Sequence, residues 1–145
     1  MSTGGNQLNM AERIIDFLDQ TGFDDLPADA VEYCKLLVMD TMGVALPGAE
    51  APGCPQVTGQ LASWSSSAGA RLLLNGGTVA PPLAALGNST IMHALDFDDT
   101  LDASALHCMV SVLPAAMAAA EAQGGVDGKR FINALVLGVE VICRL

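Results

Sequence analysis

Apolar residues recur at intervals of three and four along nearly the whole chain. This spacing is the feature that most restricts which folds the chain can adopt. Such spacing places apolar side chains on one face of a helix. With 51% hydrophobic residues among 145, the chain can bury a sizeable core. We therefore expect one all-α, helical bundle-like domain. The segments predicted to be helical are 9–20, 28–46, 55–66, 81–95, 109–123 and 127–145.

Start and stop residues mark several of these helices. Asn9, with Glu12 three residues later, predicts a capped start, and Asp127 predicts another. Pro47 and Gly48 are expected to end the second helix, which should be more deeply buried than the first. Pro114 predicts either a kink or a later start in the Ala-rich helix. The residues expected in the core include Cys34, Trp64, Cys143 and the methionines.

One segment has a pattern that favours a strand over a helix. The short apolar run 71–74 leads into Asn75, Gly76 and Gly77, and an apolar run ending in Asn-Gly is typical of a hairpin. We expect at most one short β excursion, near residues 70–79.

Charge and cysteine usage exclude several classes of protein. Six Lys and Arg against sixteen Asp and Glu give a net charge of −10, which repels nucleic acid and anionic membranes. The N-terminus lacks the pattern of a signal peptide, and no apolar run reaches membrane-spanning length. Four separated cysteines without a CxxC pair fit reduced thiols. We expect a soluble, cytoplasmic protein without nucleic-acid or membrane partners.

Charged and polar side chains are concentrated in segment 93–107. Only 15% of the chain is charged, yet four aspartates fall within seven residues, beside a threonine and two histidines. Like charges this close resist folding unless something compensates them. The members of this group are His93, Asp96, Asp98, Asp99, Thr100, Asp102 and His107.

Three local interpretations of this segment can be compared. A solvated helix end explains the charges but leaves both histidines unexplained. Residues 96–100 match the D-x-D-x-T loop of haloacid-dehalogenase-type phosphatases, but that loop follows a buried strand near a domain start, and helices precede it here. Residues 98–102 match the DDxxD magnesium motif of terpenoid synthases, which need an aromatic cavity, and aromatic residues are only 4% of this chain.

A longer pattern explains more of the segment. Residues 88–114, NSTIMHALDFDDTLDASALHCMVSVLP, resemble the signature of the MmgE/PrpD family. Further similarity lies at Leu46-Pro47-Gly48, in the turn at 75–77, and in residues 128–141, so the resemblance covers essentially the whole chain. It implies a partial N-terminal helical domain over 1–145. In complete members, a smaller α+β domain follows and the active site lies in the cleft between the two.

The resemblance also implies an activity and its residues. Family members dehydrate, decarboxylate or epimerise small di- and tricarboxylic acids, without a metal or cofactor. Asp96, Thr100 and His107 match the family's catalytic and substrate-binding positions. The chemistry suits these residues: His107 can carry a proton near neutral pH, and Thr100 can donate a hydrogen bond to a carboxylate. Asp96 could orient an imidazole or accept a substrate hydroxyl, and a helical turn would place it on the same face as Thr100.

The neighbouring polar residues are expected to be structural. His93 fits a hydrogen-bonding histidine better than a catalyst, and Asp98 and Asp99 fit caps or partners of loop N–H groups. Two departures from the family pattern border the site: Leu101 stands where histidine is frequent, and Cys108-Met109 stand where proline and a small residue are usual.

The end of the chain and its apolar faces lead to expectations about its activity and its oligomeric state. The last helix is apolar to its end at 141–145, so we expect an N-terminal fragment or shortened homologue that is not fully active alone. Family members pair through this domain, so we expect a homodimer or higher homo-oligomer. The alternative to an enzyme part is a non-catalytic helical module that self-associates.

Overall fold

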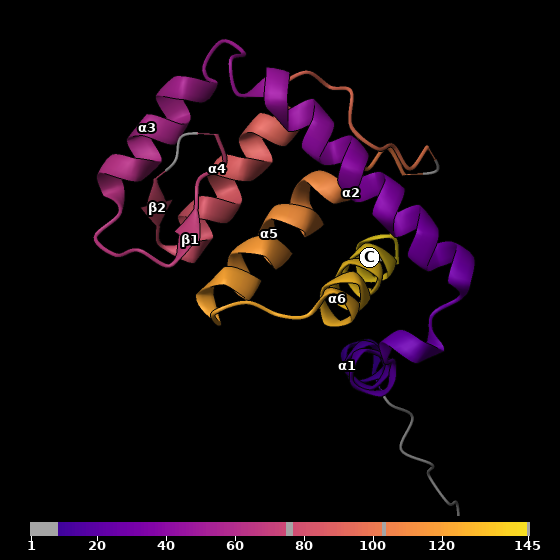
Figure 1. The fold of residues 1–145 in the computed structure, drawn as a ribbon. Coiled ribbons are helices and arrows are strands. Elements are labelled where there is room, and N and C mark those ends of the chain that lie inside the picture. Colours follow the sequence, from indigo (N-terminus) through magenta and orange to yellow (C-terminus); the bar gives the residue numbers. More distant parts are fainter. Residues whose placement is uncertain (1–8, 75–76, 103, 145) are drawn as a thin grey trace, which may run out of the picture.

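The computed structural model describes residues 9–74, 77–102 and 104–144, and it is built mainly of helices (Figure 1). The all-α prediction is confirmed, and a single 3₁₀ turn at Phe23–Asp25 joins the first two helices. The helices are α1 (Met10–Gln20), α2 (Ala28–Gly48), α3 (Cys54–Trp64), α4 (Pro81–His93), α5 (Met109–Ala122) and α6 (Gly128–Ile142).

Local signals explain where the helices begin. The side chain of Asn9 accepts from the backbone N–H of Glu12 at 3.0 Å, and the Glu12 carboxylate accepts from Asn9 N–H at 2.8 Å, which confirms the predicted cap. Asp127 caps α6 with one hydrogen bond, in which its side chain accepts from Arg130 N–H at 2.9 Å. The later start considered for α5 is wrong, because that helix begins at Met109 and continues through Pro114.

Helix α2 contacts three of the other helices. It packs against α4, α5 and α6, and Figure 1 shows it crossing over these three helices. Pro47 and Gly48 form its last turn instead of following it, a small correction to the predicted end. The close approach of α2 to α4 explains why residue 48 is a glycine, since a Cβ at Gly48 would lie 2.0 Å from the carbonyl oxygen of Ile91 on α4.

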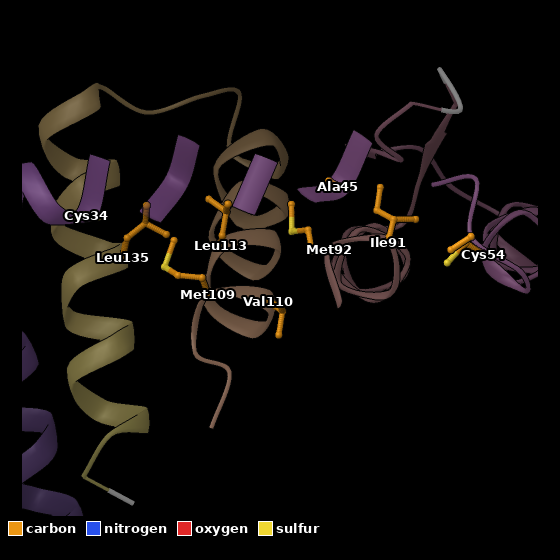
Figure 2. Close-up of a cluster of buried hydrophobic side chains, with 10 residues drawn as sticks. Cys34, Ala45, Cys54, Ile91, Met92, Met109, Val110, Leu113 and Leu135 are labelled. Carbon is orange, nitrogen blue, oxygen red and sulfur yellow. The ribbon is translucent and has the colours of Figure 1, made fainter. Parts of the chain in front are cut away.

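The main core lies beneath α2, as a band of side chains from α2, α4, α5, α6, the start of α3 and the turn before it (Figure 2). Burying one large aliphatic side chain stabilises a fold by about 1.5–3 kcal/mol, so this band supplies much of the driving force. The buried members of the band are Cys34, Ala45, Ala51, Cys54, Ile91, Met92, Met109, Val110, Leu113 and Leu135.

Some predicted core residues lie at the surface. Trp64 is 67% exposed at the last position of α3, and Met10 and Met39 are exposed to a similar extent. Cys143 is also exposed, whereas Cys34 is buried as predicted. These errors share one cause: spacing shows which face of a helix is apolar, but not whether another element covers it.

The predicted β excursion is present and short. Strand β1 (Ala70–Arg71) pairs antiparallel with β2 (Thr78–Val79), with Ala70 opposite Val79. The predicted Asn75-Gly76 turn lies outside the described residues. Asn88 of α4 anchors the hairpin, since its amide donates to the Arg71 carbonyl at 2.9 Å and its carbonyl oxygen accepts from Leu73 N–H at 2.8 Å.

Among the described residues, no helix combines the length and apolar character needed to cross a membrane.

Candidate functional site

The polar segment forms the irregular connection between α4 and α5, drawn in orange in Figure 1. Two contacts fix its path. Leu101 N–H donates to the Leu106 carbonyl at 2.8 Å, and the Asp99 carboxylate accepts from the N–H groups of Cys108 and Met109 at 3.1 and 2.9 Å. Asp99 therefore binds the start of α5, which confirms the structural role predicted for it.

Asp98 has a different role from the one predicted. Its side chain is 0% exposed and lies between the two histidines. Its Oδ2 atom is 3.0 Å from Nδ1 of His93 and 3.1 Å from Nδ1 of His107. The expectation that Asp98 caps a helix or binds loop N–H groups is wrong, because its carboxylate faces two imidazoles instead.

The structure brings together two of the three predicted site residues. Nε2 of His107 lies 3.8 Å from Oδ1 of Asp96, and the side chains are 29% and 78% exposed. Asp96 has a φ of 56°, in the left-handed region that non-glycine residues rarely adopt. This conformation turns the chain just after α4.

Thr100 lies apart from that pair. The turn between Asp96 and Thr100 is not helical, so the condition for placing them on one face is not met. Thr100 lines a pocket of about 460 Å³ together with Tyr33 and Leu36 of α2. Asp98 is also among the residues around this pocket, although its side chain is fully buried.

His93, at the C-terminal end of α4, completes the cluster. Its ring centroid is 5.0 Å from that of His107, with the ring planes inclined by 57°. The sequence contains a signal for this arrangement. It has no Lys or Arg between Arg71 and Lys129, so the two histidines are the nearest basic side chains in sequence to the aspartates.

The cluster has the donor atoms of a metal site. One ligand atom each from His93, Asp96, Asp98 and His107 lies within 4.8 Å of the others. Imidazole nitrogens combined with carboxylate oxygens suit divalent transition ions such as Zn²⁺. The arrangement can thus exchange protons or coordinate a cation.

A thiol pair borders the site. Sγ of Cys108, next to His107, lies 3.7 Å from Sγ of Cys143 near the end of α6. Burial, followed by the contact with Cys143 and the charge of Asp99, raises the pKa of Cys108 to about 11. The Cys108 thiol is therefore protonated and unreactive near neutral pH.

Fold and site together define a helical domain that carries an imidazole–carboxylate cluster on the loop between two of its helices. Residues 12–145 match the model of the MmgE/PrpD N-terminal domain. The chain belongs to the MmgE/PrpD family.

Curated relatives agree with this assignment. The chain is 32% identical over 121 residues to cis-aconitate decarboxylase from Aspergillus terreus, covering 81% of this chain and 25% of that protein. It is 28% identical over 138 residues to cis-aconitate decarboxylase-like protein oryM from Aspergillus oryzae, covering 91% and 29%. The chain thus spans between a quarter and a third of the length of these relatives.

Proposed function

We propose that this chain contributes the proton-transferring and carboxylate-binding groups of an enzyme acting on a small di- or tricarboxylic acid. The reaction is dehydration, decarboxylation or epimerisation. The observation that carries the proposal is the 3.8 Å approach of His107 Nε2 to Asp96 Oδ1 at the surface of the α4–α5 loop. Names of the relatives add cis-aconitate as one candidate substrate.

The roles follow from the chemistry of each group. Dehydration and epimerisation begin with removal of a proton next to a carboxylate, and decarboxylation requires delivery of a proton to carbon. His107, partly enclosed at 29% exposure, is the group that carries this proton. Asp96 orients the His107 ring or accepts a substrate hydroxyl. Thr100 donates a hydrogen bond to a substrate carboxylate in the adjoining pocket.

The size of the pocket supports a small substrate. Its volume of about 460 Å³ falls in the range of ordinary ligand pockets, roughly 300–1,000 Å³. Because the chain spans only part of its relatives' length, we propose that full activity needs residues outside these 145.

Hydrogen exchange with solvent tests this function. The protein, expressed with its complete reading frame, is incubated in D₂O with cis-aconitate, 2-methylcitrate or iminodisuccinate, and deuterium in the carbon skeleton is followed by NMR. One of these acids should take up deuterium, and His107→Ala should lower the rate at least about 100-fold. Asp102→Asn is the matched control, because it removes a nearby exposed charge. Equal rates in His107→Ala and the wild type would refute the role of His107.

Self-association is a second candidate function, favoured by exposed apolar side chains on α2. Tyr33, Leu36 and Met39 are 63%, 56% and 67% exposed and follow one another at three-residue spacing. Such a stripe is typical of a surface that meets a partner. Light scattering should give at least twice the 14.9 kDa chain mass, and Leu36→Glu should lower it. A monomeric wild type at micromolar concentration would exclude this function.

A further inference from the structure

The buried carboxylate of Asp98 is not used by the proposed function. Burying a carboxylate without a partner costs several kcal/mol, so a fully buried Asp98 requires compensation. Within the described ranges, its ion-pair partners are His93 and His107, and neither a lysine nor an arginine pairs with it. The two imidazoles are therefore the groups that face this carboxylate.

The two histidines contact Asp98 differently. Nδ1 of His93 lies within hydrogen-bonding distance of both carboxylate oxygens, at 3.0 and 3.2 Å. Nδ1 of His107 is as close, at 3.1 Å, but it is not aligned for a hydrogen bond and is buried without a hydrogen-bond partner among the described residues. Asp98 is thus primarily the hydrogen-bond partner of His93.

This contact determines which nitrogen of His93 is free. A carboxylate that faces Nδ1 keeps the proton on that nitrogen in the neutral ring. The lone pair is then on Nε2, at the opposite edge. The His93 side chain is 51% exposed and lines an open pocket of about 570 Å³ beside Ser89 and Thr90. Half of this side chain therefore remains accessible to a ligand while Nδ1 faces Asp98.

We propose that His93 is a second catalytic residue of this site and that Asp98 is its positioning residue. This inference rests on the proposed function and extends it, because a step that both removes and delivers a proton uses two groups and His107 supplies one of them. The ring centroids of His93 and His107 are 5.0 Å apart, close enough for both to reach one small substrate.

The proton balance shows why two imidazoles are useful. In a dehydration, one neutral imidazole takes the proton as the C–H bond breaks, and that electron pair forms the new C=C bond. The C–O bond then breaks with its pair on oxygen, and the other ring, protonated beforehand, gives a proton to the departing hydroxyl, which leaves as water. In an epimerisation, one ring removes the proton and the other returns one to the opposite face of the same carbon.

The first test measures the tautomer of His93 and needs no substrate. The chain contains only two histidines, so ¹⁵N-histidine labelling gives two sets of ring signals, which His93→Gln assigns. At a pH where the rings are neutral, His93 should show the Nδ1–H tautomer. In Asp98→Leu the acceptor is lost, and the His93 signals should move towards the Nε2–H form. An Nε2–H tautomer in the wild type, or no change in Asp98→Leu, would overturn the pairing.

The second test measures deuterium exchange in the complete protein used to test the proposed function. His93→Ala should lower the exchange rate at least about 100-fold with KM little changed, and added imidazole should restore part of the rate. His93→Gln keeps the side-chain size and should be slow without rescue, while Asp102→Asn should match the wild type.

The outcomes separate the two proposals. Exchange that depends on His107 but is unchanged in His93→Ala would refute the role of His93 and leave the proposed function intact. No exchange with any of the three acids in the wild type would refute both. A slow His93→Ala variant that folds normally by circular dichroism but is not rescued by imidazole would indicate a structural role and overturn the proposal.

Discussion

Gly48 and Ile91 fix the separation of α2 and α4, because a Cβ at Gly48 would lie 2.0 Å from the Ile91 carbonyl oxygen. That oxygen belongs to backbone and cannot rotate away, so the two helices meet at the closest distance their backbones allow. The α4–α5 loop starts three residues after Ile91, and the loop's position therefore depends on this contact.

Gly48→Ala should destabilise the protein by about 2–3 kcal/mol, since the added methyl group forces α2 and α4 apart. Gly43→Ala is the matched control in the same helix, where a Cβ meets nothing within 4 Å. That control should be neutral or gain up to about 1 kcal/mol from helix propensity. Urea unfolding followed by circular dichroism measures both, and equal midpoints for the two variants would contradict the packing argument.

Ala105→Gly should stabilise the loop before His107. Ala105 is exposed and has a φ of 51°, a conformation that costs a residue with a Cβ roughly 1 kcal/mol and costs glycine little. The unfolded chain gains freedom as well, so the net gain should stay below about 1 kcal/mol.

The same substitution in a regular helix should act in the opposite direction. Ala119→Gly, at an exposed position in α5, should lose about 0.5–1 kcal/mol. Thermal unfolding of the two variants gives the comparison, and a loss at both positions would show that the backbone of Ala105 is not strained.

Stability should fall as the pH rises from about 9 to about 11. The folded protein raises the pKa of Cys108 from 9.0 to about 11, so in this window the unfolded chain releases a proton that the folded chain keeps. The unfolded state then binds fewer protons, and the free energy of unfolding decreases with pH. Burial raises the pKa of Cys34 in the same direction.

Cys108→Ala should make that pH dependence shallower, which urea midpoints at pH 8, 9.5 and 11 would measure. Lysine and tyrosine titration contributes equally to both proteins and cancels in the comparison. Parallel slopes for the variant and the wild type would show that Cys108 titrates normally.

Zn²⁺ should inhibit deuterium exchange, because an ion held by His93, Asp96, Asp98 and His107 would occupy the nitrogen lone pairs needed for proton transfer. Addition of EDTA should restore the rate. Mg²⁺ at the same concentration is the control, since it prefers oxygen ligands. A rate that rises with Zn²⁺ would instead identify the cluster as a functional metal centre.

Much of the fold could be predicted because helix formation is encoded over short stretches. Apolar spacing located the helices, and the pairs Asn9 with Glu12 and Asp127 with Arg130 are local enough to be read from sequence. Trp64 was misplaced because burial depends on a second element. Trp64 is the last residue of α3 and is 67% exposed, so no other element of the described structure covers it there.

The candidate site was predictable only in part. Asp96 and His107 are close together, as their types and the family resemblance implied, and Thr100 lies in the adjoining pocket. Their catalytic roles remain predictions. Asp98 was misassigned because an aspartate next to Asp99 has the same local signals, yet one binds N–H groups of α5 and the other lies between two imidazoles.

Sequence by itself determined that this chain is helical, acidic and rich in proton-carrying groups at one loop, because helix periodicity, charge and side-chain chemistry are properties of neighbouring residues. Only the tertiary structure decided which carboxylate is buried and which histidine nitrogens face it. Those properties arise where α4, the loop and the start of α5 meet, and the desolvation of Asp98 there makes its pairing with the imidazoles necessary.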